Sequence, residues 1–201
     1  MKPLPEQDLL RVQQLITALN GVFRLSDLQI ALKSRNLPTL HNRINRIVRA
    51  GLLKRFRNGI YIAEGFSRET LSIRINPAAY LSLGTVLAAN GLIGTAPEKR
   101  LYAVKIGRSR RYQHADLTIE HLGISAGIYF GFIERNGIKY ADSEKAYLDT
   151  LYYHMKGRRF SFNPAADVNT GLLNMARIRR YLARYKNGRF VKFCRGLLDG
   201  R

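Results

Sequence analysis

The sequence predicts an α+β protein, and three observations point to this class. Apolar residues recur at helical spacing through much of residues 9–51. Asn-Gly pairs at 58–59 and 136–137 each stand between strand-like runs, which is the strongest short hairpin signal. Two segments near the C-terminus combine helical spacing with many basic residues. We therefore expect an N-terminal winged helix-turn-helix followed by a mixed α/β C-terminal domain that ends in basic helices.

Three helices and a hairpin are expected in the first 63 residues. In order, they are a helix over 9–19, a helix over 26–34, a helix over about 38–51, and a hairpin of residues 52–56 and 60–63. Asn20-Gly21 ends the first helix, and Gly51 ends the third. Ser26 and Gln29 have the spacing of a capping box at the start of the second helix.

The third helix has two opposite faces on a helical wheel. The side expected to be buried carries Leu40, Ile44, Ile47 and Val48. The opposite side carries Thr39, Asn42, Arg43, Arg46 and Arg49. These residue types read base edges and hold phosphates, so this face is a candidate DNA-binding surface. A solvated surface helix is the alternative, which three arginines and no acid on one face disfavour.

The hairpin that follows is basic at its tip. Its candidate DNA-binding residues are Lys54, Arg55 and Arg57. A wing at this place would lie against phosphates beside the groove. The alternative is an exposed hairpin whose basic side chains discourage edge pairing.

The remaining sequence predicts a mixed α/β domain. In order, the expected elements are a helix over 81–89, strands over 101–106, 117–122, 128–134 and 138–141, a helix from about 143 to 155, and two helices on either side of Asn187-Gly188. Asp142 or Ser143 can cap the long helix, and Gly157 ends it. A boundary after Gly65 divides the chain into a DNA-binding domain over 1–65 and a second domain over 66–201.

Composition excludes several classes of protein. Of the 201 residues, 46% are apolar and 24% charged, a balance that is typical of globular proteins. No apolar run reaches the length of a membrane-spanning helix. The first ten residues hold two prolines and two acids where a signal peptide needs an apolar run. The single cysteine, Cys194, excludes an internal disulfide and a cysteine-rich zinc site. We expect a cytoplasmic protein that does not bind membranes.

The net charge of +20 is the strongest indication of a partner. Such an excess usually serves a polyanion, because counterion release favours phosphate contacts. Residues 1–65 hold 11 basic and 4 acidic residues, and residues 66–201 hold 23 and 10, so both halves are basic. The alternative is a protein that is basic without a polyanionic partner.

Two helices of the second half carry further candidate surfaces. In the segment 175–185, Arg177, Arg180 and Arg184 form a stripe opposite the apolar residues, suited to DNA backbone or to an acidic partner. A solvated face is the alternative. Three tyrosines in the long helix are either interface anchors or core residues, and the core is favoured for Leu148, Leu151 and Tyr152.

Three blocks of the sequence resemble the AbiEi-type antitoxins, the regulators of type IV toxin–antitoxin systems. Residues 40–55, from Leu40-His41-Asn42-Arg43 to Leu53-Lys54-Arg55, with Gly59-Ile60-Tyr61, resemble the winged helix of that family. Residues 77–83 before Asn90-Gly91, and residues 143–152, resemble its downstream blocks. The resemblance extends from about Leu9 to Leu198, and departs from the family in the basic stretch 102–114 and in the last helices.

The resemblance implies a DNA-binding repressor of its own operon, acting at an operator with an inverted repeat. It also implies an antitoxin whose second domain counteracts a cognate toxin, commonly a nucleotidyltransferase, in a phage-defence system. From the residues alone, an RNA-binding or ribosome-associated protein and a protein-interaction module without DNA binding remain alternatives.

No pattern points to catalysis. The four histidines, His41, His114, His121 and His154, lack metal-ligand spacing. Nothing marks the carboxylate pairs Asp116/Glu120 and Glu144/Asp149 as metal sites. We expect no enzyme activity, no catalytic residue, no cofactor and no metal.

Overall fold

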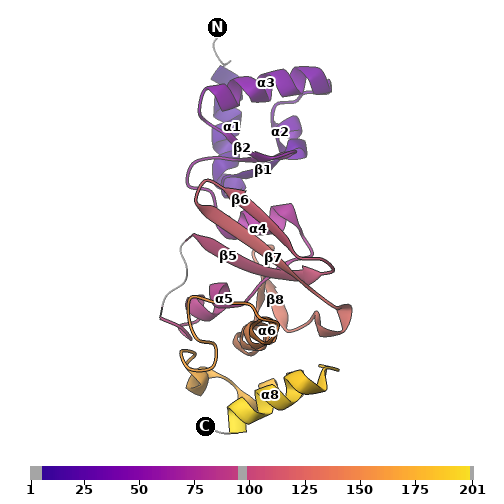
Figure 1. Ribbon diagram of the computed structural model, residues 1–201. Coiled ribbons are helices and arrows are strands. Elements are labelled where there is room, and N and C mark those ends of the chain that lie inside the picture. The colour runs from indigo at the N-terminus through magenta and orange to yellow at the C-terminus, as the bar shows by residue number, and fades with distance from the viewer. Residues whose placement is uncertain (1–5, 95–98, 200–201) are drawn as a thin grey trace. The chain divides into compact units, whose positions relative to one another are not determined.

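The computed structural model describes residues 6–94 and 99–199. The chain forms two compact units, Met1–Pro77 and Ala78–Arg201 (Figure 1). The described chain contains both helices and strands, and the strands form two sheets. The expected mixed α+β class is therefore confirmed.

The first unit combines helices with a small antiparallel sheet. Its elements are α1 (Glu6–Ala18), β1 (Val22–Arg24), α2 (Leu25–Ala31), α3 (Leu37–Arg49), β2 (Lys54–Arg57), β3 (Ile60–Ile62) and α4 (Arg68–Ile75). The strand order is β1-β3-β2. Its core is a cluster of buried side chains: Val12, Phe23, Leu28, Leu32, Leu40, Ile44, Ile47, Leu53, Tyr61 and Ala63.

The capping of α2 differs from the expectation. The chain enters the helix directly from β1, so Arg24 is the cap residue and its backbone N–H donates to Asp27 Oδ2 at 2.8 Å. The predicted capping box of Ser26 and Gln29 is therefore wrong, because the cap residue and its partner lie two residues earlier, at Arg24 and Asp27. The start of α3 is simpler, because the Asn36 side chain accepts a 3.0 Å bond from the Thr39 N–H.

The first unit continues past the predicted boundary at Gly65. Ser67 caps the unpredicted helix α4. Arg24 donates from its guanidinium to the Arg74 carbonyl at 2.9 and 3.3 Å. Arg74 in turn lies 3.2 Å from the Asp27 carboxylate. These contacts attach α4 to β1 and α2, and the compact unit ends at Pro77.

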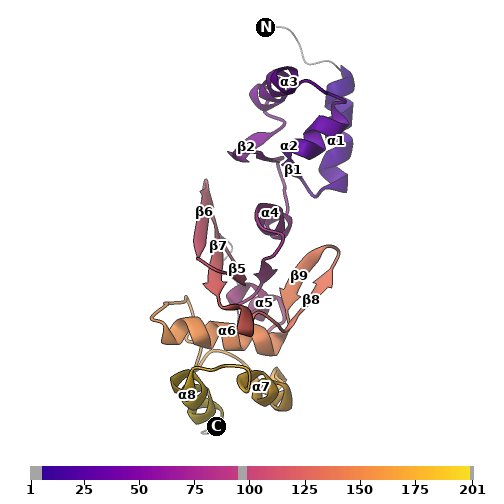
Figure 2. The same ribbon diagram turned by 90° about the vertical axis from the view of Figure 1, so that its right-hand side faces the viewer.

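The second unit is built on a mixed sheet. Its strands are β4 (Tyr80–Leu81), β5 (Arg100–Ile106), β6 (Arg110–His114), β7 (Leu117–Ile124), β8 (Phe132–Arg135) and β9 (Ile138–Ala141), in the order β6-β7-β5-β4-β9-β8. Its helices are α5 (Gly84–Ala89), α6 (Ser143–Met155), α7 (Met175–Leu182) and α8 (Gly188–Asp199), with short 3₁₀ turns at Ala126–Ile128 and Thr170–Leu172. The helix α6 lies between the sheet and the pair α7 and α8 (Figure 2).

Several local predictions for the second unit are confirmed and others are not. Asn136 and Gly137 have φ of 51° and 74°, as a tight hairpin turn requires, and they join β8 to β9. Asp142 caps α6 by accepting from the Lys145 N–H. The expected strand over 128–134 is shorter and begins at Phe132, and the expected helix over 81–89 is preceded by β4 and begins at Gly84.

The strand β7 lies between β5 and β6 in the sheet, and this order explains why residue 123 is a glycine. The connection from β5 to β6 crosses the end of β7, where a Cβ on Gly123 would stand 1.8 Å from the Gly107 carbonyl oxygen. Gly123 N–H also donates to Ser109 Oγ at 2.9 Å. Only glycine leaves room for this crossing.

Candidate nucleic-acid interface

The helix α3 has one buried side and one exposed side. Leu40, Ile44 and Ile47 are fully buried, and Val48 is half-buried against the same core. The exposed candidates are Thr39, Asn42, Arg46 and Arg49. The helical wheel thus placed these four residues correctly on the surface of the first unit.

Arg43 differs from its neighbours because its guanidinium is used inside the fold. Its Nε donates to Asp8 Oδ2 at 2.9 Å, and its Nη2 donates to Asp8 Oδ1. Its Nη1 donates to the Leu32 carbonyl at 2.7 Å. The hydrogen bond to the buried Asp8 raises the pKa of Arg43. Arg43 therefore joins α1, α3 and the end of α2.

The hairpin of β2 and β3 presents the other basic candidates. Lys54, Arg55 and Arg57 are exposed on β2, whereas the residues of β3 are buried. Gly59, with φ of 74°, makes the turn, and its carbonyl accepts a 2.9 Å bond from the Leu25 N–H. The turn is thereby held against the start of α2.

The charge of this region is entirely positive. Between Asp27 and Glu64 the chain has eight Lys and Arg residues and no Asp or Glu. An anion that approaches the exposed side of α3 or β2 therefore meets no carboxylate from this segment.

The arginine stripe of α7 is mostly engaged within the second unit. Arg177 donates to Glu144 Oε2 at 3.1 Å and lies 3.9 Å from Asp142. The Arg184 guanidinium lies 3.9 Å from the centre of the Phe130 ring. Arg180 is exposed. Arg177 is thus engaged within the unit. Arg184, which follows α7, packs against the Phe130 ring and is exposed like Arg180.

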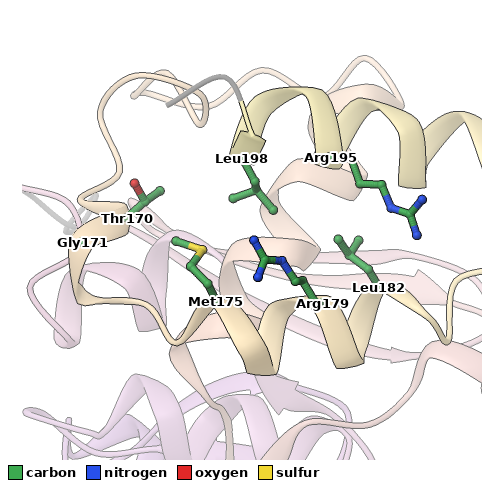
Figure 3. Close-up of a pocket in the computed structure, with 7 residues that line it drawn as sticks. All are labelled: Thr170, Gly171, Met175, Arg179, Leu182, Arg195 and Leu198. Atoms are coloured by element: carbon green, nitrogen blue, oxygen red, sulfur yellow. The ribbon is translucent and has the colours of Figure 1, made fainter.

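The helices α7 and α8 also enclose a cleft of about 470 Å³ (Figure 3). Met175, Leu182 and Leu198 give it an apolar lining. Arg179 and Arg195 also line it. Figure 3 shows both arginine side chains extending into the space between the two helices.

The two downstream blocks of the resemblance meet in the core of the second unit. Lys145 and Asp149 form a fully buried ion pair on α6. Tyr80 OH and Ser82 Oγ donate to Asp149 Oδ2 at 2.9 and 2.8 Å. Lys145 Nζ lies 3.2 Å from Tyr185 OH. This network fixes α6 to β4, which gives the blocks a structural role.

The aromatic residues of α6 pack inward. Leu148, Leu151 and Tyr147 are fully buried. Tyr152 is half-buried, and its ring lies 5.5 Å from that of Phe190 on α8. The core interpretation of this helix is the one that fits.

The described residues hold no group of three or more His, Cys, Asp or Glu side chains that could bind a metal ion. Over the same part of the chain, no helix has the length and apolar character to cross a membrane.

Burial lowers the pKa of His121 to about 4, with a smaller contribution from the charge of Lys105.

Comparison with known proteins finds similarity at the level of the fold. The chain is similar to the crystal structure of the RV2827C protein from Mycobacterium tuberculosis, with a TM-score of 0.54 and 16% sequence identity. The similarity covers 100% of this chain and 74% of that one. No protein-family model matches the chain, and no curated protein matches it.

Proposed function

We propose that the first unit is a winged helix-turn-helix that binds double-stranded DNA, and that the protein is a repressor and antitoxin of a type IV toxin–antitoxin system. The observation that carries the DNA-binding proposal is the exposed side of α3. Its Asn42, Arg46 and Arg49 project from a helix whose opposite side is buried. Lys54, Arg55 and Arg57 on β2 supply phosphate contacts in this scheme.

The proposed target is an operator with an inverted repeat upstream of the protein's own gene. Arg46→Ala should weaken operator binding by about 1–3 kcal/mol if Arg46 contacts a base. Lys54→Ala with Arg55→Ala should weaken all DNA sequences alike and reduce the slope of affinity against salt by about 2, one for each phosphate contact.

Fluorescence anisotropy with labelled promoter and scrambled duplexes measures both effects. Arg135→Ala, an exposed charge at the β8–β9 hairpin of the second unit, is the matched control. Wild-type affinity in the Arg46 variant would remove α3 from the interface. Tighter binding of single-stranded RNA than of duplex would favour the RNA-binding alternative.

The antitoxin part of the proposal depends on the resemblance of the downstream blocks, and the surface of α7 and α8 is the contact we assign to it. A nucleotidyltransferase toxin would place an acidic segment in the α7–α8 cleft, because the cleft pairs an apolar lining with Arg179 and Arg195. Replacing Arg179, Arg180 and Arg195 by Glu should abolish protection of cells that express the toxin. The same variant should leave operator binding intact, and unchanged protection would disprove this contact.

A further inference from the structure

An open groove of about 570 Å³ lies in the second unit beside the end of α6. We call it the β6–α6 groove. Its lining comprises Ser109, Arg110, Arg111, Glu120, Leu122, Gly123, Tyr153, Lys156, Gly157 and Arg158. Tyr153 OH donates to the Gly123 carbonyl at 2.9 Å, which holds α6 against β7 along the groove. Its volume is that of a small-molecule site.

Arginines from three separate segments converge on one carboxylate at this groove. Glu120, on β7, is almost completely buried. Arg158 donates to its Oε2 from the segment after α6, and Arg111 of β6 lies 3.8 Å from the same oxygen. Arg100 of β5 lies 3.6 Å from Oε1. One carboxylate thus fixes three guanidinium groups that would otherwise repel one another.

The groove keeps a large positive excess after this pairing. Arg111, Lys156 and Arg158 supply its cationic side chains, and Glu120 is the one acid of the lining. Arg110 also borders the groove, but its side chain lies on the other face of β6, the face of its cross-strand partner His121. The Arg158 Nε is buried and has no hydrogen-bond partner among the described residues. The side chain of Arg111 is 60% exposed. Donors therefore remain for an added anion, because each guanidinium has five N–H groups.

Local structure explains only part of this cluster. The C-terminal end of α6 attracts cations through its dipole, and Lys156 Nζ lies 4.2 Å from the Tyr152 ring. Arg158 lies over the Tyr102 ring at 5.2 Å. Neither effect involves Arg111, which comes from β6.

We propose that the β6–α6 groove binds a phosphoryl group, carried by a small molecule such as a nucleoside monophosphate or present as free phosphate. Arg111 and Arg158 meet at the Glu120 carboxylate, so their remaining N–H groups lie close together. Such a cluster suits a single dianionic group better than the spaced charges of a phosphodiester backbone. The site lies within the second unit and does not depend on the proposed binding of DNA by the first.

Isothermal titration calorimetry of the full-length protein with AMP and with inorganic phosphate, at constant ionic strength, tests the site. Arg111→Gln with Lys156→Gln should weaken AMP binding about tenfold or more. The matched control, Arg135→Gln with Lys186→Gln, removes the same charge from exposed positions outside the groove and should change affinity less than about twofold. Circular dichroism establishes that each variant is folded.

Phosphate should compete with AMP for the site. Tighter binding of AMP identifies a nucleotide as the source of the phosphoryl group, and equal affinity identifies free phosphate. The proposal is overturned if wild-type protein binds neither probe at millimolar concentration, or if control and groove variants weaken equally. It is also overturned if a single-stranded RNA oligomer binds the groove and AMP does not displace it.

Discussion

At the scale of single residues, we expect Arg43 to stabilise the fold of the first unit rather than to contact DNA. Its guanidinium makes hydrogen bonds to Asp8 and to the Leu32 carbonyl, and Asp8 is almost fully buried. Arg43→Ala leaves that carboxylate buried without its partner, so we expect a loss of about 2–4 kcal/mol in the free energy of unfolding. Urea denaturation measures this loss.

Arg46→Ala is the control for this prediction, because Arg46 is exposed on the same helix. It should change stability by less than about 0.5 kcal/mol. Asp8→Asn should reproduce much of the Arg43→Ala loss. If Arg43→Ala kept full stability and lost DNA affinity, the residue would belong to the DNA-contacting surface.

His121 gives the second residue-scale prediction. Its pKa is about 4 in the folded state against 6.5 for an ordinary histidine. The unfolded state therefore binds more protons between these values, and stability is lost as the pH falls through this window. The full difference corresponds to about 3 kcal/mol.

Urea denaturation at neutral pH and near the lower pKa compares wild type with His121→Asn, which does not titrate there. The groups near His121 are Lys105, whose charge lowers its pKa, Arg110, its cross-strand partner, and the ring of Tyr112. The wild type should lose more stability than the variant, and parallel pH profiles would contradict the assignment.

The sequence could predict the exposed side of α3 but not the roles of Asp8 or Glu120. Periodicity within one helix fixes which residues face the core, so Asn42, Arg46 and Arg49 followed from local pattern. Ion pairs such as Arg43 with Asp8 join residues far apart in the chain, and one sequence carries no signal for them. The β6–α6 groove was missed for the same reason.

At the scale of elements, the two hairpin turns could be predicted from the sequence, whereas the edge strand β6 could not. Both Asn-Gly hairpins are present, although the first strand of the second hairpin, β8, is shorter than expected. The strand β6 was missed because Arg110, Arg111, Gln113 and His114 replace the apolar residues that mark a strand. Such a composition suits an edge strand, which β6 is.

Gly123 tests the crossing of the β5–β6 connection over β7. Gly123→Ala brings a methyl group against the Gly107 carbonyl, so the crossing must open at a cost of at least about 2–3 kcal/mol. Gly127→Ala is the matched control, since nothing lies within 4 Å of its added Cβ. Thermal unfolding of the two variants should separate them clearly. Equal melting temperatures would mean that the crossing is not close.

At the scale of the whole molecule, the position of the boundary decides which fragments are stable. The sequence placed it after Gly65, where an exposed Glu-Gly segment follows the hairpin. The structure keeps α4 with the first unit, through the contacts of Arg24 with the Arg74 carbonyl and of Arg74 with Asp27. Composition could not reveal this, because α4 has no strong apolar periodicity of its own.

The two boundaries predict different fragments. A fragment of residues 1–77 should be more stable than one of 1–65 by about 1–3 kcal/mol, because only the longer fragment keeps the hydrogen bond from the Ser67 N–H to the Asn20 carbonyl and the ion pair of Arg74 with Asp27. Hydrogen bonds between Arg24 and the Arg74 carbonyl add to the difference. Urea denaturation of both fragments measures it, and equal stability would support the boundary at Gly65.

If the proposed division of function also holds, the 1–77 fragment binds operator DNA and the 78–201 fragment protects cells from the toxin. Protection by 1–77 alone would assign both activities to the first unit, since that fragment lacks α7 and α8 altogether.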